Sequence, residues 1–397
     1  MKRLWKSIPP CLSDVLGLQA VVSQTNGLAV IDDPSRYKPL RTGAERPPFS
    51  GGRRDGRAEG RRGGHGGRGG TSRVVNSDIR NEDIILGTQQ KVVDAAMAGV
   101  ETYAPDFILL SQAPSSAMIG TDLAATAEII ASRSGLTTAC VDVQGDRDYI
   151  YGISRTLETM GRLLLREQSR LPGTVNLLGC NAVDWHGDTL AGAEKLAEAA
   201  GCRVLSRWGV KESTENLKRA SAAGMNWVVH ISGLRLARYM EEEFGIPFVV
   251  GAPFGAVRAD DPWFTRSCRV TAREPAEPEV LVVGEQLMAN AIRCSLERRG
   301  LGAVRVLSFG EMEKAYMRSG DRRLTGEEEL AEECRRPSVR LVLADGDLRA
   351  AAGRELPWIP LPNGASMSPI DAVANFNMAG AALDTWLDSA LEGREAR

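Results

Sequence analysis

The sequence has no apolar run of about 18 residues, the length that a membrane-spanning helix requires. Its first ten residues carry three basic side chains, and no apolar stretch follows them, which argues against a secretory signal. These two absences predict a cytoplasmic protein that has no membrane partner.

Cysteine pairs at metal-binding spacing are also missing. The seven cysteines form no CxxC pair, their number is odd, and the closest two, Cys180 and Cys202, lie far apart in the sequence. This pattern argues against a disulfide framework and against a local zinc site. Most of the cysteines are expected to be small buried side chains. A metal cluster built from distant cysteines stays open, because separation in sequence does not limit separation in space.

Familiar nucleotide and hydrolase motifs are missing from the predicted strand–helix units. The unit at 280–310 has a single glycine, Gly284, at its turn and no GxGxxG there, and the chain has no GxxxxGKS/T and no GxSxG, so neither NAD nor a serine-type triad is predicted. Only three histidines are present. His65 lies in a Gly/Arg-rich segment, and His230 lies in an apolar stretch that favours a core histidine. His186 follows a predicted strand and is a candidate ligand or base.

Residues 43–73 differ in composition from the rest of the chain. They hold 11 glycines, eight arginines and three acidic residues, and almost no apolar side chains. Such a segment cannot bury enough surface to offset its ordering entropy, so it is predicted to be a disordered insertion. Its Arg/Gly pattern is typical of some RNA-binding segments. RNA binding is the less favoured alternative, and the net charge of the whole chain is −2.

The remainder alternates short apolar runs with helical patterns. Residues 105–111 suit a buried parallel strand, and the next helix can be capped by Thr121 or Asp122 and ended by Gly135. The same order recurs along the 397 residues and predicts parallel sheets covered on both faces. Ligands of such sheets bind beyond the carboxyl ends of the strands. The loops expected there are Asp32–Tyr37, Ser111–Gly120, Gln144–Asp148, Asn181–Gly187, Gly251–Gly255 and Asp345–Asp347.

Several stretches together resemble one family. They include "APSSAMIGTDLAATAEIIASRSGL", "VNLLGCNAVD", "GIPFVVGAPFG" and "VLVVGEQLMANAIRCSLE", and they cover nearly the whole chain outside the Gly/Arg-rich segment. The chain resembles the nitrogenase component 1 family. This resemblance implies three Rossmann-like αβα domains, pairing with a homologous subunit as a homo- or hetero-oligomer, and a cluster at the subunit interface. It also implies electrons from an ATP-driven iron protein and a small-molecule substrate.

The expected domain organisation follows from the resemblance and from the composition. It comprises an N-terminal cluster-region segment (1–42), the insertion (43–73), and αβα domains at 74–170, 171–270 and 271–397, the last with a C-terminal helix.

The cysteine ligands that the resemblance implies are mostly missing. Family members place a Gly-Cys pair where this chain has Arg36–Tyr37, and "SQAPSSAMIG" lacks the cysteine that often precedes the next helix. Cys11 alone is left as a candidate ligand for an iron–sulfur cluster, which normally takes four thiolates. Either a partner supplies the others, or carboxylates help, or the cluster is lost. The candidate carboxylates are Asp14, Asp32 and Asp33.

The predicted function is a diverged component 1-like oxidoreductase subunit with a pocket in the crevice between domains. The alternatives are a cluster-free pseudo-subunit or cofactor carrier and, less favoured, a metal-chelate binder of periplasmic type. Met118 is predicted to lie at the ligand site, and packing in the core is the alternative role for its side chain. The resemblance also implies a site role for Asp345 and Asp347, and capping of a helix N-terminus is their alternative role. The predicted cofactor-binding residues are Ser115, Met118, Gly120, Asp122, Asn181, His186 and Asn363.

Overall fold

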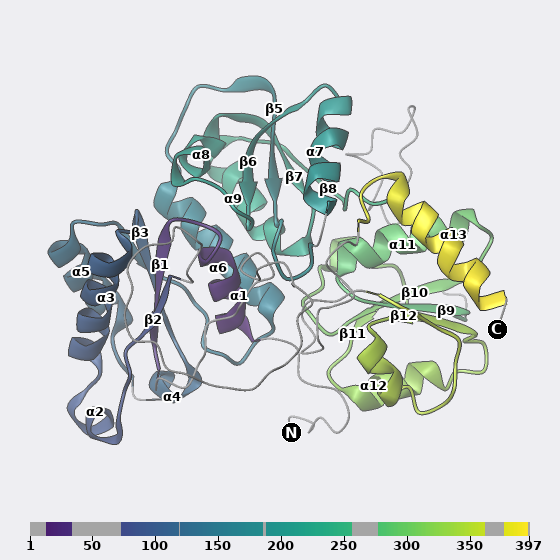
Figure 1. Ribbon diagram of the computed structural model, residues 1–397, viewed down its shortest axis with the longest axis horizontal. Coiled ribbons are helices and arrows are strands. Elements are labelled where there is room, and N and C mark those ends of the chain that lie inside the picture. Colours follow the sequence, from purple (N-terminus) through teal and green to yellow (C-terminus); the bar gives the residue numbers. More distant parts are fainter. Residues whose placement is uncertain are drawn as a thin grey trace, which may run out of the picture.

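Three separate parallel sheets organise the chain. The computed structural model describes residues 13–33, 73–118, 120–185, 188–255, 277–361 and 377–395. The strand orders are β2-β1-β3-β4, β6-β5-β7-β8 and β11-β10-β9-β12-β13, and every pairing among these strands is parallel. Figure 1 shows the three groups around the middle of the molecule.

The first sheet is covered by helices on both faces. Leu28 and Val30 pack with one cluster that includes residues of α3 and α5, whereas Ala29 and Ile31 pack with the cluster that includes residues of α1 and α6. This alternation is the two-residue period of a strand buried on both sides. The elements are α1 (Asp14–Val22), β1 (Gly27–Asp32), β2 (Val74–Asn76), α2 (Asn81–Leu86), α3 (Gln89–Tyr103), β3 (Phe107–Gln112), α4 (Pro114–Ala117), α5 (Leu123–Ser134), β4 (Thr138–Cys140) and α6 (Tyr149–Leu164).

The second sheet repeats the strand–helix order. The sequence offers Ser213 or Thr214 as the cap of α8, and the structure uses Ser213, whose side chain accepts from the Asn216 N–H; Gly245 ends α9 in the left-handed conformation. The elements are β5 (Leu171–Leu178), α7 (Thr189–Ala199), β6 (Arg203–Trp208), α8 (Thr214–Arg219), η2 (Ala220–Ala222), β7 (Ala223–Val228), η3 (Ile231–Gly233), α9 (Leu234–Phe244) and β8 (Phe248–Val250).

The third sheet carries the C-terminal helix. Arg299, which directly follows α11, pairs with Asp384 and Asp388 of α13, at 2.8 and 2.7 Å. The elements are β9 (Val280–Val283), α11 (Gln286–Arg298), β10 (Val304–Ser308), η4 (Lys314–Tyr316), β11 (Arg322–Arg323), α12 (Glu327–Cys334), β12 (Leu341–Ala344), η5 (Gly346–Ala351), β13 (Trp358–Pro360) and α13 (Ala381–Glu395).

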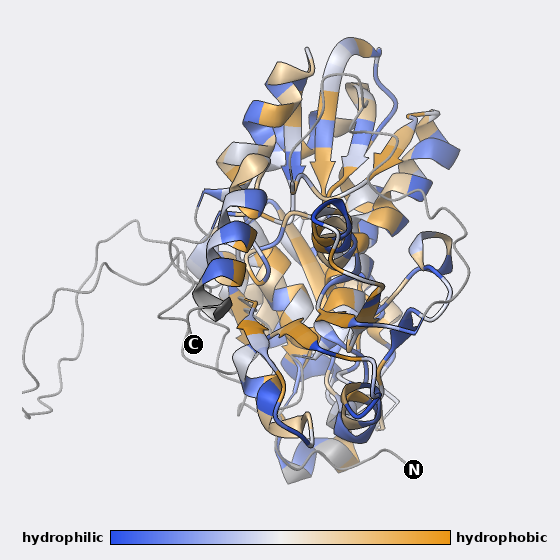
Figure 2. Ribbon diagram, turned by 90° about the vertical axis from the view of Figure 1, so that its right-hand side faces the viewer, coloured by the Kyte–Doolittle hydropathy of each residue, from blue (hydrophilic) through white to orange (hydrophobic). Residues whose placement is uncertain are grey.

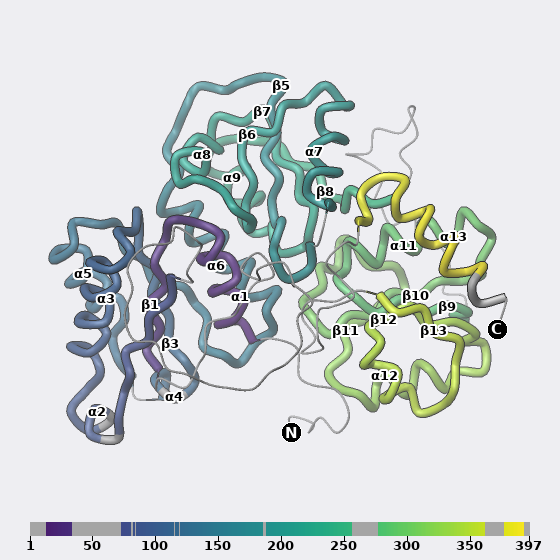
Figure 3. Tube along the Cα trace, in the orientation of Figure 1, coloured from purple at the N-terminus to yellow at the C-terminus, as the bar shows by residue number. Residues whose placement is uncertain are grey.

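One hydrophobic cluster joins the three sheets. It includes Ile31 of the first sheet, Val228 of the second and Val282 of the third, together with Leu157 of α6. Figure 2 shows largely hydrophobic strands near the centre of the view and mixed colours on the helices outside them. Figure 3 shows α1, drawn in purple, lying beside α6. The sheets are therefore packed around a shared core.

The predicted fold class is confirmed: the chain is built from αβα units with parallel sheets. The apolar runs at 226–232 and 136–145 predict strands, and the observed strands are shorter: β7 ends at Val228, and β4 covers only Thr138–Cys140. The helical pattern at 368–393 predicts the C-terminal helix. Residues 381–393 do lie in α13, whereas 368–376 and the insertion at 43–72 lie outside the described residues. The domain boundaries stay a prediction. No described helix has the length and apolar character needed to cross a bilayer.

Candidate functional site

A pocket lies where the second and third sheets meet. Its volume is about 380 Å³. One wall follows the carboxyl end of β7, and the opposite wall follows the carboxyl end of β10. The lining residues are Ser154, Ile231, Leu234, Arg235, Arg238, Glu311, Met312, Glu313, Lys314, Met317 and Arg323. The edge of a parallel sheet where its strands end is the usual place for a ligand.

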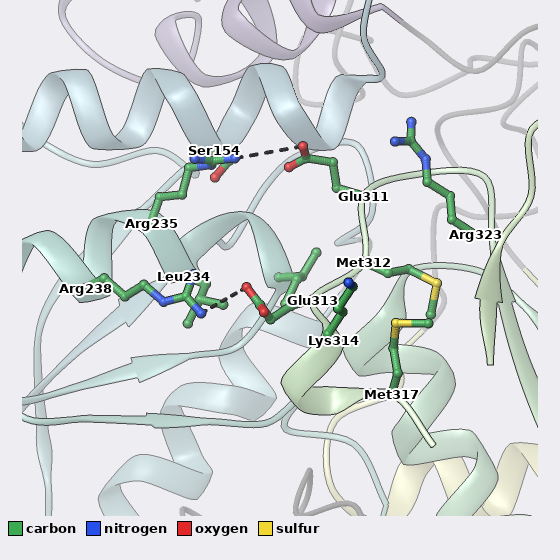
Figure 4. A pocket seen from close by; sticks show the side chains of 11 residues that line it. Ser154, Leu234, Arg235, Arg238, Glu311, Met312, Glu313, Lys314, Met317 and Arg323 are labelled. Carbon is green, nitrogen blue, oxygen red and sulfur yellow. Dashed lines mark hydrogen bonds and ion pairs between the residues drawn. The ribbon is translucent and has the colours of Figure 1, made fainter. Parts of the chain in front are cut away.

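Charged side chains dominate the rim of the pocket. Figure 4 shows Arg235 and Arg238 facing Glu311 and Glu313. Arg238 bonds Glu313 at 2.9 Å, whereas Arg235 and Glu311 are 3.9 Å apart. Burial raises the pKa of Glu311, and the nearby Asp148 carboxylate raises it further. Glu311 therefore holds its proton at a higher pH than an ordinary glutamate.

Two buried side chains at the start of α11 hold both walls. Glu285 accepts from the Ile231 N–H at 3.0 Å and caps α11 through the Met288 N–H at 2.8 Å. Gln286 accepts from the Glu313 N–H and donates to the Glu313 carbonyl, at 2.7 and 2.9 Å. These bonds satisfy loop backbone that would otherwise be buried without partners. The pocket walls are consequently fixed to the third sheet.

A buried histidine lies directly behind the pocket wall. His230 precedes Ile231, and its side chain is 2% exposed. Its Nε2 is 2.9 Å from Asp184 Oδ2 and its Nδ1 is 2.8 Å from Ser232 Oγ. The Tyr149 hydroxyl donates to Asp184 Oδ1 at 2.9 Å. The prediction of a core histidine is confirmed, although His230 follows the strand and caps η3.

The edge of the first sheet holds a second polar cluster. Asp32 is fully buried and accepts from the hydroxyls of Ser77 and Thr88, at 2.7 and 2.8 Å. Thr88 and Thr121 hydroxyls are 2.6 Å apart. Asp14 accepts instead from the N–H groups of Gln144 and Gly145, and Asp33 is buried. Asp14 and Asp32 thus satisfy local hydrogen-bond donors in this structure.

The residues predicted in this region do not line the described pocket. Ser115 lies in α4, and Met118 follows it with 90% of its surface exposed, which rules out core packing. Gly120 is exposed and has a positive φ of 77°. Asp122 caps α5 through the Ala125 N–H at 3.0 Å. Their role in cofactor binding stays a prediction.

The remaining residues predicted from the sequence lie away from the loop that carries Met118 or outside the described part of the chain. Asn181 is buried after β5, and its Oδ1 accepts from the N–H groups of Val183 and Asp184 at 3.0 Å each, which fixes the loop that carries Asp184. Asp345 caps η5 through the Asp347 N–H at 2.8 Å, so the capping role predicted as its alternative is confirmed. Cys11, His186 and Asn363 lie outside the described residues.

Sequence reasoning missed the residues of the charged pocket. Arg235 and Arg238 lie in the first turns of the helix that follows β7, and Lys314 begins η4, the short 3-10 helix after β10. Basic residues on helices are common, so their chemistry alone gives no signal. Their position directly after predicted strands was the available signal, because those strands end at the ligand-binding edge.

Comparison with known proteins identifies the family. The family model for nitrogenase component 1 type oxidoreductases matches residues 60–313, more than half of the chain. The chain belongs to this family. The component 1 fold is also seen in the structure named "Nitrogenase Cp1 at pH 6.5", which aligns with a TM-score of 0.69 and 12% identity over 99% of this chain and 94% of that one. The resemblance found in the sequence is confirmed.

Individual relatives match a smaller part of the chain than the family model does. A light-independent protochlorophyllide reductase subunit from Zygnema circumcarinatum is 28% identical over 197 residues, which is 46% of this chain and 38% of the relative. The corresponding subunit from Acaryochloris marina is 29% identical over 201 residues, with 46% and 39% covered. The match to the chain thus spans about two-fifths of the length of these relatives.

The described residues do not fit the cluster that the component 1 family implies. They contain no group of three or more His, Cys, Asp or Glu side chains placed to hold a metal ion. Burial raises the pKa of the Cys180 thiol, and it raises that of Cys334 to about 11, which disfavours the thiolate form. The described cysteines are Cys140, Cys180, Cys202, Cys294 and Cys334.

Proposed function

We propose that this chain is a subunit of a nitrogenase-like oxidoreductase that binds a small-molecule substrate in the pocket between the second and third sheets. The observation that carries the proposal is the position of this pocket, which lies at the carboxyl ends of β7 and β10 in a chain of the component 1 family. A pocket of about 380 Å³ falls within the ~300–1,000 Å³ range of small-molecule sites.

Reduction of a substrate requires protons as well as electrons. Glu311 is our candidate proton donor, because it lines the pocket and burial raises the pKa of its carboxyl group. Its nearest cation, Arg235, is 3.9 Å away and leaves the carboxyl group accessible to a bound substrate. Glu285 and Gln286 hold the two walls in place during the reaction.

The electron supply is proposed from the family. An ATP-driven iron protein delivers electrons, and a homologous component 1 subunit pairs with this chain, in the cytoplasm. Because the described residues do not fit an iron–sulfur cluster, most of its ligands would come from the partner subunit. Cys11 is the candidate ligand that this chain adds.

A cluster-free subunit is the second candidate function. The specific observation in its favour is the absence of any metal-ligand group among the residues that the structure describes. In that case the chain pairs with an active homologue and contributes a scaffold or a carrier site for a cofactor.

Metal analysis separates the two candidates. The chain is purified anaerobically, alone and co-expressed with a homologous subunit, and iron and acid-labile sulfide are measured. The proposal expects stoichiometric iron and sulfide that are lost in Cys11→Ala. The control Cys202→Ala removes a partly exposed thiol at the start of β6 and should retain both. Absence of iron under both conditions would refute the cluster and leave the cluster-free subunit.

Electron delivery is tested in the same preparation. Addition of an iron protein and MgATP should reduce the iron-loaded complex, and omission of ATP should prevent the reduction. Reduction that proceeds equally without ATP would contradict the proposed partner.

A further inference from the structure

We propose that the pocket takes an organic anion, a carboxylate attached to an apolar body, and that Lys314 binds the carboxylate. This inference rests on the proposed function, because it names the class of substrate for the same pocket. It is carried by the distribution of charge among the lining residues, by the fixed backbone on either side of the exposed Lys314 and by the apolar side chains beside it.

The positive charge of the pocket exceeds what its own carboxylates neutralise. Four cationic side chains line it against two acidic ones. Arg238 bonds Glu313 at 2.9 Å, and Arg323 bonds Asp148, outside the lining, at 2.8 Å. Arg235 approaches Glu311 no closer than 3.9 Å.

Lys314 differs from these arginines. Among the residues that the structure describes, its ammonium group makes no ion pair within 4.0 Å, although the preceding residue, Glu313, and the pocket rim carry charge. Figure 4 places it on the side of the third sheet, close to the methionines. An incoming carboxylate therefore meets a cation that no internal anion occupies, and it displaces no existing ion pair.

The backbone around Lys314 is held in position before a ligand arrives. Gln286 bonds both the N–H and the carbonyl of Glu313, the preceding residue. Asn290 donates to the Tyr316 carbonyl at 3.0 Å. Both anchors project from α11, so the loop that carries Lys314 is attached to a rigid element. A fixed loop lowers the ordering cost of binding.

The remaining lining explains why the ligand is organic. Met312 and Met317 come from the same loop as Lys314, and Ile231 and Leu234 form the facing wall. Methionine side chains adapt to irregular apolar shapes. A small inorganic anion would leave these surfaces without contacts, whereas an apolar body attached to the carboxylate covers them.

The acidic lining residues limit the charge that the ligand can carry. Glu313 directly precedes Lys314 in the chain, and its carboxylate repels a second anionic group near Lys314. The surplus of cations is also modest. We therefore assign a single carboxylate rather than a polyphosphate, in agreement with the missing phosphate-binding motifs.

The experiment measures binding with a matched pair of probes. The full chain is titrated by calorimetry with 1-naphthaleneacetate and with 1-naphthaleneacetamide, which share their apolar body and differ in charge. The acid should bind roughly fivefold more tightly than the amide. Lys314→Met should remove that difference, and Lys314→Arg should restore it. The control Lys195→Met, on the exposed surface of α7, should leave both affinities unchanged.

The outcomes separate this inference from the proposed function. Equal binding of acid and amide, or no binding of either probe, would overturn the carboxylate site. A difference that survives in Lys314→Met would overturn the role of Lys314. None of these results depends on iron or on electron delivery, so a chain that lacks both would refute the proposed reductase and still leave selective carboxylate binding measurable.

Discussion

At the scale of single residues, His230 connects parts of the chain that belong to different sheets. Its partner Asp184 follows β5, Tyr149 opens α6, and Glu285 follows β9. Burial alone would lower the pKa of His230, but the Glu285 and Asp184 carboxylates outweigh burial and raise the pKa above its ordinary value of 6.5. The imidazolium form is thus stabilised by folding.

The stability of the protein should consequently depend on this group and on pH. A histidine whose folded pKa is raised contributes stability that is fully present below the unfolded pKa and is lost as pH rises through the folded pKa. The free energy of unfolding should therefore fall as pH rises above about 6.5. His230→Asn should lower it by ~2 kcal/mol at pH 6 and flatten its pH dependence. Urea unfolding between pH 5.5 and 8.5 measures both effects.

A second variant distinguishes the effect of the charge on His230 from the effect of its hydrogen bond with the Ser232 hydroxyl. Ser232→Ala removes the partner of Nδ1 and keeps both facing carboxylates. It should retain the pH dependence at lower overall stability. If the His230→Asn protein showed the same pH dependence as the wild type, the charged form of His230 would not be the cause.

At the scale of elements, α1 and α6 cross in direct backbone contact. A Cβ at Gly152 would lie 2.0 Å from the Asp14 carbonyl oxygen, and one at Gly17 would lie 2.3 Å from that of Tyr149. The two glycines therefore permit the close approach of the helices. The crossing also places Asp14 against the loop after β4, where it bonds Gln144 and Gly145.

Gly152→Ala should separate these helices. The new methyl group meets backbone atoms, which cannot move aside as a flexible side chain can, so we expect a loss of about 3 kcal/mol in the free energy of unfolding. Gly346→Ala is the control, because its nearest neighbour would be at 4.0 Å. Thermal and urea unfolding measure the difference. Equal stability of the two variants would contradict the close crossing.

The same elements show how far the sequence predicts the structure. Strand β3 and helix α5 were predictable, because a proline-bounded apolar run and a capped helical pattern are local signals. Helix α6 is absent from the predicted elements, since its sequence, YIYGISRTLETMGRLL, mixes glycine with aromatic and β-branched residues. Its helical form depends on packing against α1 and α9, which no local signal reports.

The candidate site was predictable only in its general position. The pocket lies at the carboxyl ends of strands, where a ligand was expected. The residues that the sequence predicted for the site, however, lie in the loops near Met118 and Asn181, which do not line it. The pocket instead joins α9 with the loop that carries Lys314, two segments that are far apart in the sequence. Their proximity arises from the packing of two sheets, and one sequence does not encode that proximity in any local pattern.

At the scale of the whole molecule, the shared core couples the three sheets. Separate domains often unfold independently, because their interfaces are smaller and more polar than their cores. Here one cluster of buried apolar residues around Leu157 continues from α1 through α6 to α9 and the third sheet. We therefore expect the described part of the chain to unfold as one cooperative unit.

Leu157→Ala tests this coupling. Leu157 is fully buried in α6, so its truncation should cost about 2–5 kcal/mol. Of the seven tryptophans, the five described ones lie in the second unit (Trp185, Trp208 and Trp227) and the third (Trp358 and Trp386). Their fluorescence therefore reports on those two units, whereas far-UV circular dichroism reports on all three sheets. Both signals should shift to the same lower urea midpoint. A fluorescence midpoint that stays unchanged while the dichroism midpoint falls would show that the sheets unfold independently and that the shared core does not couple them.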